Sequence, residues 1–329
     1  MLFEEQLARK PNKYPWTQDF IQQIWNHPWF PTDFKFSADF QQFHGELNDE
    51  ERGILVRAIS AIGQIEIAVK TFWAKLGENL PHPALSDLGL EMSHTEVVHN
   101  IAYETVLDRL GLTAVFEENL KLPVIAGRVA YLRKYNKQVY EGDKRKQYVY
   151  ALILFTLFVE NVSLFSQFYV ILWFNRVRRV MRDTAQQVQY TRNEELLHAQ
   201  VGIKIINTLK EEYPELFDAE LEARVLAETQ EAFRAESAVI DWIMGGFAER
   251  GVDSAISAPI LKTFVAHRLN TSLQAIGYAP VMPVDAALLA DTVWMDEENY
   301  GNNKTDFFHK RPVDYAKHAK TYNLEDLLR

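Results

Sequence analysis

Hydrophobic and polar positions recur along most of this chain with a helical period of i, i+3 and i+4, and strand-like alternation is scarce. No proline occurs between Pro31 and Pro81 or between Pro123 and Pro214, so long helices can run uninterrupted there. Asn48, followed by acidic residues, is predicted to cap the first of them. The predicted long helices and the region of shorter helices that follows them are 48–78, 83–111, 114–139, 145–173, 177–209, 215–249 and 252–297. The predicted fold class is all-α.

The most apolar segment, residues 148–174, is long enough to cross a membrane. It carries Glu160, Asn161, Ser163 and Gln167 through its middle, where a lipid-facing helix would tolerate them poorly. We therefore expect a helix buried inside a protein, and no membrane partner.

The chain contains no repeat and no interior linker, which favours one helical domain with an N-terminal arm over residues 1–298. From about Asn299 the sequence becomes polar, rich in Gly and Asn, and loses its periodicity until the final "NLEDLLR". We interpret residues 299–329 as a flexible tail that ends in a partner-binding segment. A frayed terminus without a role is the alternative.

Composition narrows the possible functions. The 329 residues carry a net charge of −10, which argues against a nucleic-acid partner because such a protein needs a basic surface. The first residues contain no apolar core of the signal-peptide type, so we expect a cytoplasmic protein. The chain has no cysteine, which excludes disulfides, zinc–thiolate sites, iron–sulfur clusters and cysteine nucleophiles. Any metal must be bound through oxygen and nitrogen.

The segment "HTEVVHNIAYE", residues 94–104, places Glu96, His99 and Tyr103 within about 60° of one another on one helix face. A second Glu-x-x-His follows as Glu195 and His198. One such motif is weak evidence, because exposed Glu and His often meet at this spacing.

Two further acids, Glu66 and Glu160, lie in apolar helical surroundings, and each alone could be a salt bridge. Taken together with the two Glu-x-x-His motifs, they match the ligand set that binds two metals in a four-helix bundle. The intervals from Glu66 to Glu96, to Glu160 and to Glu195 are 30, 64 and 35 residues, which suits two helix pairs joined by a longer connection. Six oxygen and nitrogen ligands favour iron or manganese over copper or zinc.

Dinuclear carboxylate proteins include iron stores, hydroxylases, desaturases and radical generators. Tyr103, one turn beyond His99, could lose an electron and a proton to an oxidised metal pair, or could be an ordinary core tyrosine.

The chain resembles the radical-generating small subunit of class I ribonucleotide reductase. The resemblance rests on "EVVHNIAY", "WFPTDF" with Trp29 at 37 residues before Glu66, "ENVSLFSQF" and "NEELLH". It implies a ferritin-like helical bundle, an apolar lining of Leu164 and Phe168, and a relay from His99 through Glu194 to Trp29.

The resemblance also implies partners and an activity. The chain would be a homodimer whose tail binds a large catalytic subunit, and that subunit would supply the cysteine radical that reduces ribonucleotides. The interfacial tyrosine would be Tyr315 in "RPVDY", with Tyr322 as the second choice. The enzyme would be a ribonucleoside-diphosphate reductase, although the sequence leaves triphosphates open.

Three residues depart from the commonest family pattern: Glu66 and Glu194 replace aspartates, and Lys70 lies one turn after Glu66. The longer Glu194 puts its hydrogen bond to Trp29 in doubt. Lys70 could be an exposed lysine or a proton donor beside the metals. A subgroup that combines Glu as first ligand with such a lysine uses two manganese ions activated by superoxide. We therefore favour Mn/Mn and leave Fe/Fe and Mn/Fe open.

In the subgroup the oxidant stays on the metals, so Tyr103 would be either the stored radical or a bystander. A two-metal oxidase or hydroxylase of a hydrophobic substrate is the main competing function, and metal storage is a weaker one. An oxidase would need a ligand tunnel and would have no use for Trp29, Glu194 or a tyrosine-bearing tail.

Overall fold

The computed structural model describes residues 1–245 and 256–295, apart from the side chains of Gln64 and of residues 66–70. These residues contain helices and connecting segments but no strand, which confirms the predicted all-α class. Met1–Thr292 form one compact unit, and Val293 begins a second. The predicted tail lies outside the described residues, so its boundary stays a prediction.

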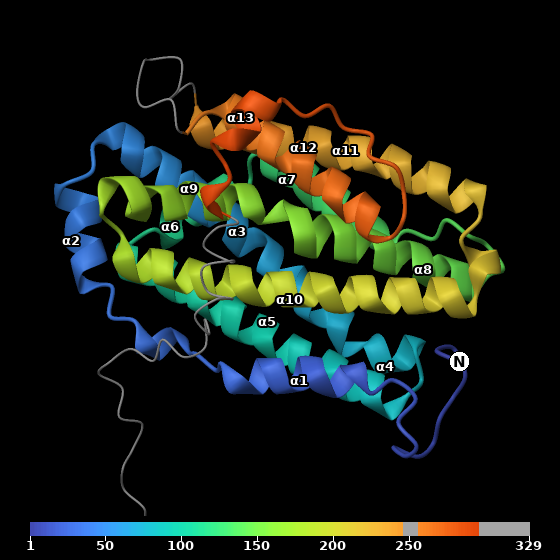
Figure 1. Cartoon of the computed structure of the whole chain (residues 1–329). Helices are drawn as coiled ribbons and strands as arrows, with labels where there is room; N and C mark the ends of the chain where they lie inside the picture. The colour runs from blue at the N-terminus through green and yellow to red at the C-terminus, as the bar shows by residue number, and fades with distance from the viewer. Residues whose placement is uncertain (246–255, 296–329) are drawn as a thin grey trace, which may run out of the picture. The chain divides into compact units, whose positions relative to one another are not determined.

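Four long helical runs lie side by side along the compact unit (Figure 1). They are α3 (Asp49–Ala74), α5 (Pro83–Leu110), the continuous run of α8 (Lys144–Leu154), η3 (Phe155–Ser163) and α9 (Phe165–Trp173), and α10 (Arg182–Glu212). The helix α3 packs on α5 and α9, and α10 packs on η3 and α9. This arrangement is the ferritin-like bundle.

The remaining helices cover the bundle. The two longer ones, α11 (Ala219–Met244) and α12 (Ala258–Ala275), pack on each other, and α12 also contacts η3. The shorter ones are α1 (Trp16–Asn26), η1 (Pro31–Asp33), α2 (Ser37–Gly45), α4 (Leu76–Asn79), α6 (Thr113–Asn119), α7 (Pro123–Leu132), η2 (Arg133–Asn136), η4 (Phe174–Arg178), η5 (Pro214–Leu216) and α13 (Ala286–Ala290).

Side chains cap the N-termini of two of the long helices, α3 and α10. The Asn48 side chain accepts hydrogen bonds from the backbone N–H of Glu50 and Glu51, which confirms the predicted start of α3. The start of α10 is capped from another helix: the fully buried Asp39 of α2 accepts from the backbone N–H of Asp183 and Thr184. Because α10 carries Glu195 and His198, Asp39 also anchors the helix that holds the second Glu-x-x-His.

Several predicted helix boundaries are wrong. The single helix predicted at 114–139 is divided into α6, α7 and η2, because Pro123 starts a new helix and the residue before it is extended. The helix predicted from 177 begins at Arg182, since Arg179 and Met181 have positive φ angles of 60° and 59°.

The apolar segment Lys144–Arg178 is long and apolar enough to span a membrane by composition alone. In its most apolar window, 94% of the residues are buried inside the bundle, as expected for the core helix of a folded domain. The structure therefore supports the interpretation of this segment as a buried helix.

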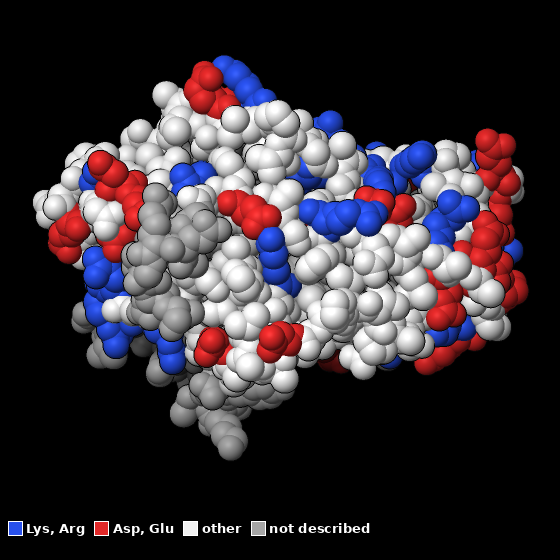
Figure 2. Space-filling view, turned by 90° about the horizontal axis from the view of Figure 1, so that it is seen from above, with Lys and Arg blue, Asp and Glu red and all other residues white. Residues whose placement is uncertain are grey.

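Acidic side chains gather at one end of the compact unit Met1–Thr292 (Figure 2). The segment from the end of α10 to the first turn of α11 carries the exposed residues Glu211, Glu215, Asp218 and Glu220. This segment is therefore strongly acidic, in keeping with the negative net charge.

Candidate metal centre

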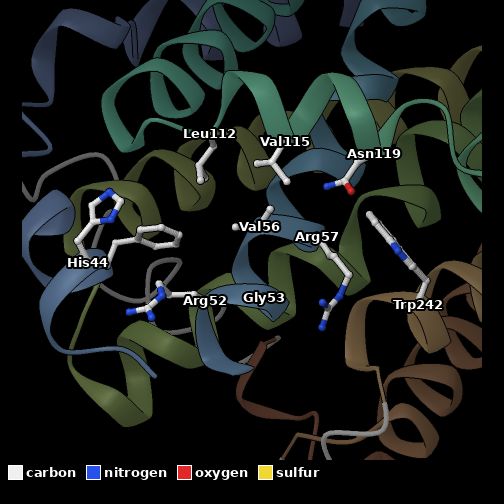
Figure 3. Close-up of a pocket in the computed structure, with 10 residues that line it drawn as sticks. His44, Arg52, Gly53, Val56, Arg57, Leu112, Val115, Asn119 and Trp242 are labelled. Carbon is white, nitrogen blue, oxygen red and sulfur yellow. The ribbon is translucent and has the colours of Figure 1, made fainter. Parts of the chain in front are cut away.

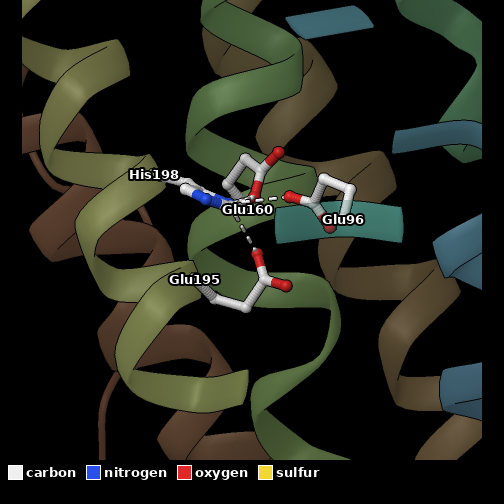
Figure 4. Close-up of side chains that lie close together, drawn as sticks. All are labelled: Glu96, Glu160, Glu195 and His198. Carbon is white, nitrogen blue, oxygen red and sulfur yellow. Dashed lines mark ion pairs between the residues drawn. The ribbon is translucent and has the colours of Figure 1, made fainter. Parts of the chain in front are cut away.

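Four buried side chains meet in the core of the bundle (Figure 4). The helix α5 contributes Glu96, η3 contributes Glu160, and α10 contributes Glu195 and His198. One possible ligand atom from each residue lies within 4.8 Å of those of the other three. The structure thus brings together four of the six predicted ligands, and their role as ligands stays a prediction.

Most oxygens and nitrogens of this cluster that could bind a metal have no hydrogen-bond partner in the protein. Glu96 Oε1, Glu160 Oε2, both carboxylate oxygens of Glu195 and both ring nitrogens of His198 are buried and accept or donate no hydrogen bond. His198 Nδ1 and Glu96 Oε1 are 2.7 Å apart, but not in hydrogen-bonding geometry. Buried carboxylates without partners are costly, and a bound cation removes that cost. The cluster therefore fits a site for metals that prefer oxygen and nitrogen ligands.

The fifth predicted ligand, His99, lies at the edge of the cluster. Its Nδ1 is 3.2 Å from Glu96 Oε2 and 3.1 Å from Glu195 Oε1, and its ring is fully buried. The other ring nitrogen, Nε2, is 2.7 Å from Glu194 Oε2. His99 therefore connects the carboxylate cluster to Glu194.

The electrostatics of the cluster reflect crowded carboxylates. Burial raises the pKa of Glu160 well above its ordinary value, and the neighbouring Glu195 and Glu96 raise it further. Burial lowers the pKa of His99, but close contacts with the carboxylates of Glu194, Glu195 and Glu96 outweigh this effect and raise the pKa well above its ordinary value. Without a metal, the cluster thus retains protons that a bound cation would replace.

Glu194 links the cluster to Trp29. The indole Nε1–H of Trp29 donates to Glu194 Oε2 over 2.8 Å, and the Trp29 and His99 rings stack with centroids 6.0 Å apart. The longer glutamate therefore makes the hydrogen bond that its length had put in doubt. The participation of these residues in a relay stays a prediction.

Trp73 is a site residue that the sequence reasoning missed. Its Nε1–H donates to Glu160 Oε1 over 2.7 Å, and its ring is completely buried. The sequence contained a signal for this contact, because Trp73 lies seven residues after the predicted ligand Glu66 and therefore on the same face of α3.

The other predicted site residues are distributed as follows. Tyr103 is buried on α5, one turn beyond His99, and Leu164 and Phe168 are buried at the junction of η3 and α9. The predictions for Glu66, Lys70, Tyr315 and Tyr322 fall outside the described side chains.

A helical bundle whose core collects carboxylates and histidines from paired Glu-x-x-His helices defines the ferritin-like dinuclear carboxylate proteins. Within this class the chain belongs to the family described as ribonucleotide reductase, small chain, whose sequence pattern matches residues 7–287. The protein is thus a small subunit of ribonucleotide reductase, an oxidoreductase that works with a large subunit.

Individual relatives agree with this assignment. The chain is 23% identical to a probable ribonucleoside-diphosphate reductase small subunit of Invertebrate iridescent virus 3, covering 97% of this chain and 87% of the relative. It is also 23% identical to the ribonucleoside-diphosphate reductase subunit beta of Chlamydia pneumoniae, covering 93% and 88%.

Solved structures share the fold. A putative class I ribonucleotide reductase from Bacillus halodurans matches with a TM-score of 0.76 at 20% identity, over 86% of this chain and 99% of the other. The dimanganese(II)-NrdF of Streptococcus sanguinis matches with a TM-score of 0.70 at 13% identity, over 87% and 97%. An R2-like ligand-binding oxidase with a Mn/Fe cofactor matches with a TM-score of 0.69 at 18% identity, over 83% and 96%.

Proposed function

We propose that this small subunit supplies an oxidising equivalent to the large catalytic subunit through His99, Glu194 and Trp29. The observation that carries the proposal is the hydrogen-bonded path from the buried cluster to Trp29, with contacts of 2.7 Å and 2.8 Å on either side of Glu194. Trp29 is only 7% exposed, so the path ends just beneath the surface.

The protonation states of this path follow from its contacts. The same oxygen, Glu194 Oε2, faces both Trp29 Nε1 and His99 Nε2. Indole can only donate, so an ionised Glu194 accepts from Trp29 and also accepts from His99 when Nε2 carries a proton. In a neutral His99 this leaves the lone pair on Nδ1, which faces Glu96 and Glu195. The hydrogen bond at Nε2 thereby orients His99 as a ligand.

When bound by the cluster, two redox-active metal ions would supply the one-electron oxidising power. The candidate ligands would be Glu66, Glu96, His99, Glu160, Glu195 and His198. Trp29 can pass its N–H proton to Glu194 as the indole loses an electron, so charge does not accumulate on the ring. Burial of the cluster excludes water and limits side reactions.

The test is the paired variants Trp29→Phe and Glu194→Gln. Both are expected to bind metal with the stoichiometry of the unmodified chain but to lose ribonucleotide reduction when the large subunit is added. Trp25→Phe is the matched control, because Trp25 is 57% exposed on α1. Full turnover by Trp29→Phe would refute the relay.

We further propose a manganese pair as the cofactor, with Fe/Fe and Mn/Fe as alternatives. The support is the resemblance carried by Glu66 and Lys70, together with the manganese named for the Streptococcus sanguinis protein and the oxidase. Metal analysis with EPR, after loading with Mn(II) or Fe(II) and exposure to oxygen or superoxide, tests it. A multiline manganese signal supports the proposal, whereas a sharp tyrosyl signal that disappears in Tyr103→Phe contradicts it.

We propose that residues 299–329 bind the large subunit and that Tyr315, or else Tyr322, continues the relay. A peptide of the last 20 or so residues should compete with the whole chain for the large subunit.

Turnover lost in Tyr315→Phe but retained in Tyr322→Phe would identify Tyr315 as the interfacial tyrosine. The names of the relatives support diphosphates as substrates, which assays of diphosphates against triphosphates would test.

We also propose that the subunit is a cytoplasmic homodimer. Leu90, Val97 and Ile101 of α5 are 56%, 40% and 48% exposed and lie within about 40° of one another on one face. This face points away from the Glu96 and His99 face, so a second copy could cover it without reaching the cluster. Val97→Glu should convert the dimer to a monomer in analytical ultracentrifugation.

An oxidase acting on a bound hydrophobic substrate is a weaker fit. The likeness to the R2-like ligand-binding oxidase is one of fold. A groove of about 520 Å³ opens between α2, α3, α6 and α11 (Figure 3), but its lining residues include none of the candidate ligands. In an oxidase, the hydrogen bonds between Trp29, Glu194 and His99 would also have no role.

A further inference from the structure

Glu160 lies in a stretch of π-helix. The nine residues Phe155–Ser163 of η3 interrupt the α-helical run between α8 and α9. A π-helix bonds each N–H to the carbonyl five residues back, so its hydrogen bonds do not join smoothly to those of the flanking α-helices. Buried carbonyls that lose a helical partner need another donor.

Three backbone carbonyls around Glu160 accept hydrogen bonds from side chains. Ser163 Oγ–H donates to Phe158 O over 2.7 Å, and Arg268 Nε–H donates to Asn161 O over 2.8 Å. Arg128 Nη2–H donates to Ser163 O. Two of the three donors are arginines from other helices.

Arg268 reaches this segment from α12. Besides its bond to the Asn161 carbonyl, its Nη2 donates to Asn161 Oδ1 over 2.6 Å, and its guanidinium lies 3.4 Å from the centroid of the Phe165 ring. The Asn161 amide in turn donates to Ser272 Oγ over 2.7 Å. Arg268 therefore holds both the backbone and the side chain of the residue that follows Glu160.

Arg128 reaches the same segment from α7 and is 1% exposed. It donates to Ala61 O of α3 over 2.8 Å and to Gln167 Oε1 of α9 over 3.0 Å. Its Nε forms a buried ion pair with Glu236 of α11 over 3.0 Å. This arginine thus ties the end of η3 to three other helices.

We propose that Arg128 and Arg268 are positioning residues for Glu160, because they stabilise the π-helical turn that directs this carboxylate into the cluster. If η3 closed to a regular α-helix, one residue would shift along the helix and rotate the two sides relative to each other by about 100°. Such a rotation would move Glu160 away from Trp73, to which it is now bonded over 2.7 Å. The inference deepens the proposed function and rests on it only for the role of Glu160 as a metal ligand.

The first test is Arg268→Lys, which keeps the positive charge but cannot donate to Asn161 through two nitrogens of one rigid plane. In the metal-free protein, hydrogen–deuterium exchange of peptides spanning 155–164 should accelerate while other core peptides stay protected. The Mn(II) affinity should fall by about 10-fold to 100-fold, as for other residues that orient ligands. Arg57→Met is the matched control, because Arg57 Nε donates to Ile243 O over 2.9 Å on a different helix.

The second test removes the buried ion pair as a unit. Arg128→Met alone would leave Glu236 buried without its partner, and such variants often fail to fold. The double variant Arg128→Met/Glu236→Leu removes both charges and is expected to fold, with the same local acceleration at 155–164 and weaker Mn(II) binding.

Unchanged exchange at 155–164 and unchanged Mn(II) affinity in both variants would overturn the proposal. Faster exchange throughout the bundle would also overturn it, because the arginines would then support only global stability. The exchange measurement needs neither metal nor the large subunit. If exchange accelerates locally in the variants but the unmodified chain shows no reductase activity with the large subunit, the proposed function is rejected and the positioning role remains.

Discussion

Substitution of Trp73 by Phe tests whether Glu160 depends on its indole partner. The change removes one buried N–H that donates to Glu160 Oε1 over 2.7 Å and keeps an aromatic ring in the same space. A hydrogen bond to a charged group contributes about 1.5–3 kcal/mol. Residues that orient a metal ligand typically contribute about 10-fold to 100-fold in affinity, or about 1.4–2.7 kcal/mol. The two ranges agree, so we expect Mn(II) to bind the Trp73→Phe protein about 10-fold to 100-fold more weakly.

The assay is competition between the metal-free protein and a chelator of known affinity for Mn(II). Trp173→Phe is the matched control, since Trp173 is also a buried tryptophan of the core but its Nε1 has no hydrogen-bond partner. Both variants lose similar apolar volume, and only Trp73→Phe loses a donor to the cluster. Equal Mn(II) affinities for the two variants would refute the reasoning, because the effect would then come from packing alone.

Three further predictions concern the scaffold. Gly202→Ala should destabilise the protein by about 1–3 kcal/mol in urea unfolding, because the new Cβ would overlap the side chain of Thr156 where α10 meets η3. Asp39→Ala removes the cap of α10 and should lower the free energy of unfolding by about 0.5–2 kcal/mol or more. Asp39→Asn keeps one acceptor oxygen and should recover part of the loss. Burial lowers the pKa of His82, whose neutral Nδ1 accepts the Ala84 N–H at the start of α5. The neutral His82 side chain therefore stabilises the fold above about pH 6.5, and this stabilisation is lost as the pH falls through the lowered pKa. The melting temperature of His82→Asn should accordingly change less between pH 7 and pH 5 than the melting temperature of the unmodified chain.

The sequence predicted the bundle and the centre of the site because the signals for both are local. The absence of proline leaves long helices intact, and the Glu-x-x-His spacing alone puts Glu96 with His99, and Glu195 with His198, on common faces. The division of 114–139 was missed because a proline early in a helical pattern can either start a helix or interrupt one.

The π-helical form of η3 could not be predicted in this way. The segment "FTLFVENVS" contains no proline or glycine and has the pattern of an ordinary buried helix. Its geometry depends on donors from Arg128 and Arg268, which lie 32 residues before and 108 residues after Glu160 in the sequence. The contact of Trp73 with Glu160 depends in the same way on how two distant helices face each other.

Glu194 and Glu195 are adjacent on α10 and contact different nitrogens of the His99 ring, Nε2 and Nδ1. Glu195 faces the buried cluster, whereas Glu194 faces Trp29 through the oxygen that it shares with His99. Successive residues of a helix are fixed about 100° apart, so neither carboxylate can be reoriented without the other. A design that transfers this stretch of α10 to another helical scaffold to obtain Glu195 would therefore also transfer Glu194, the carboxylate that accepts from Trp29.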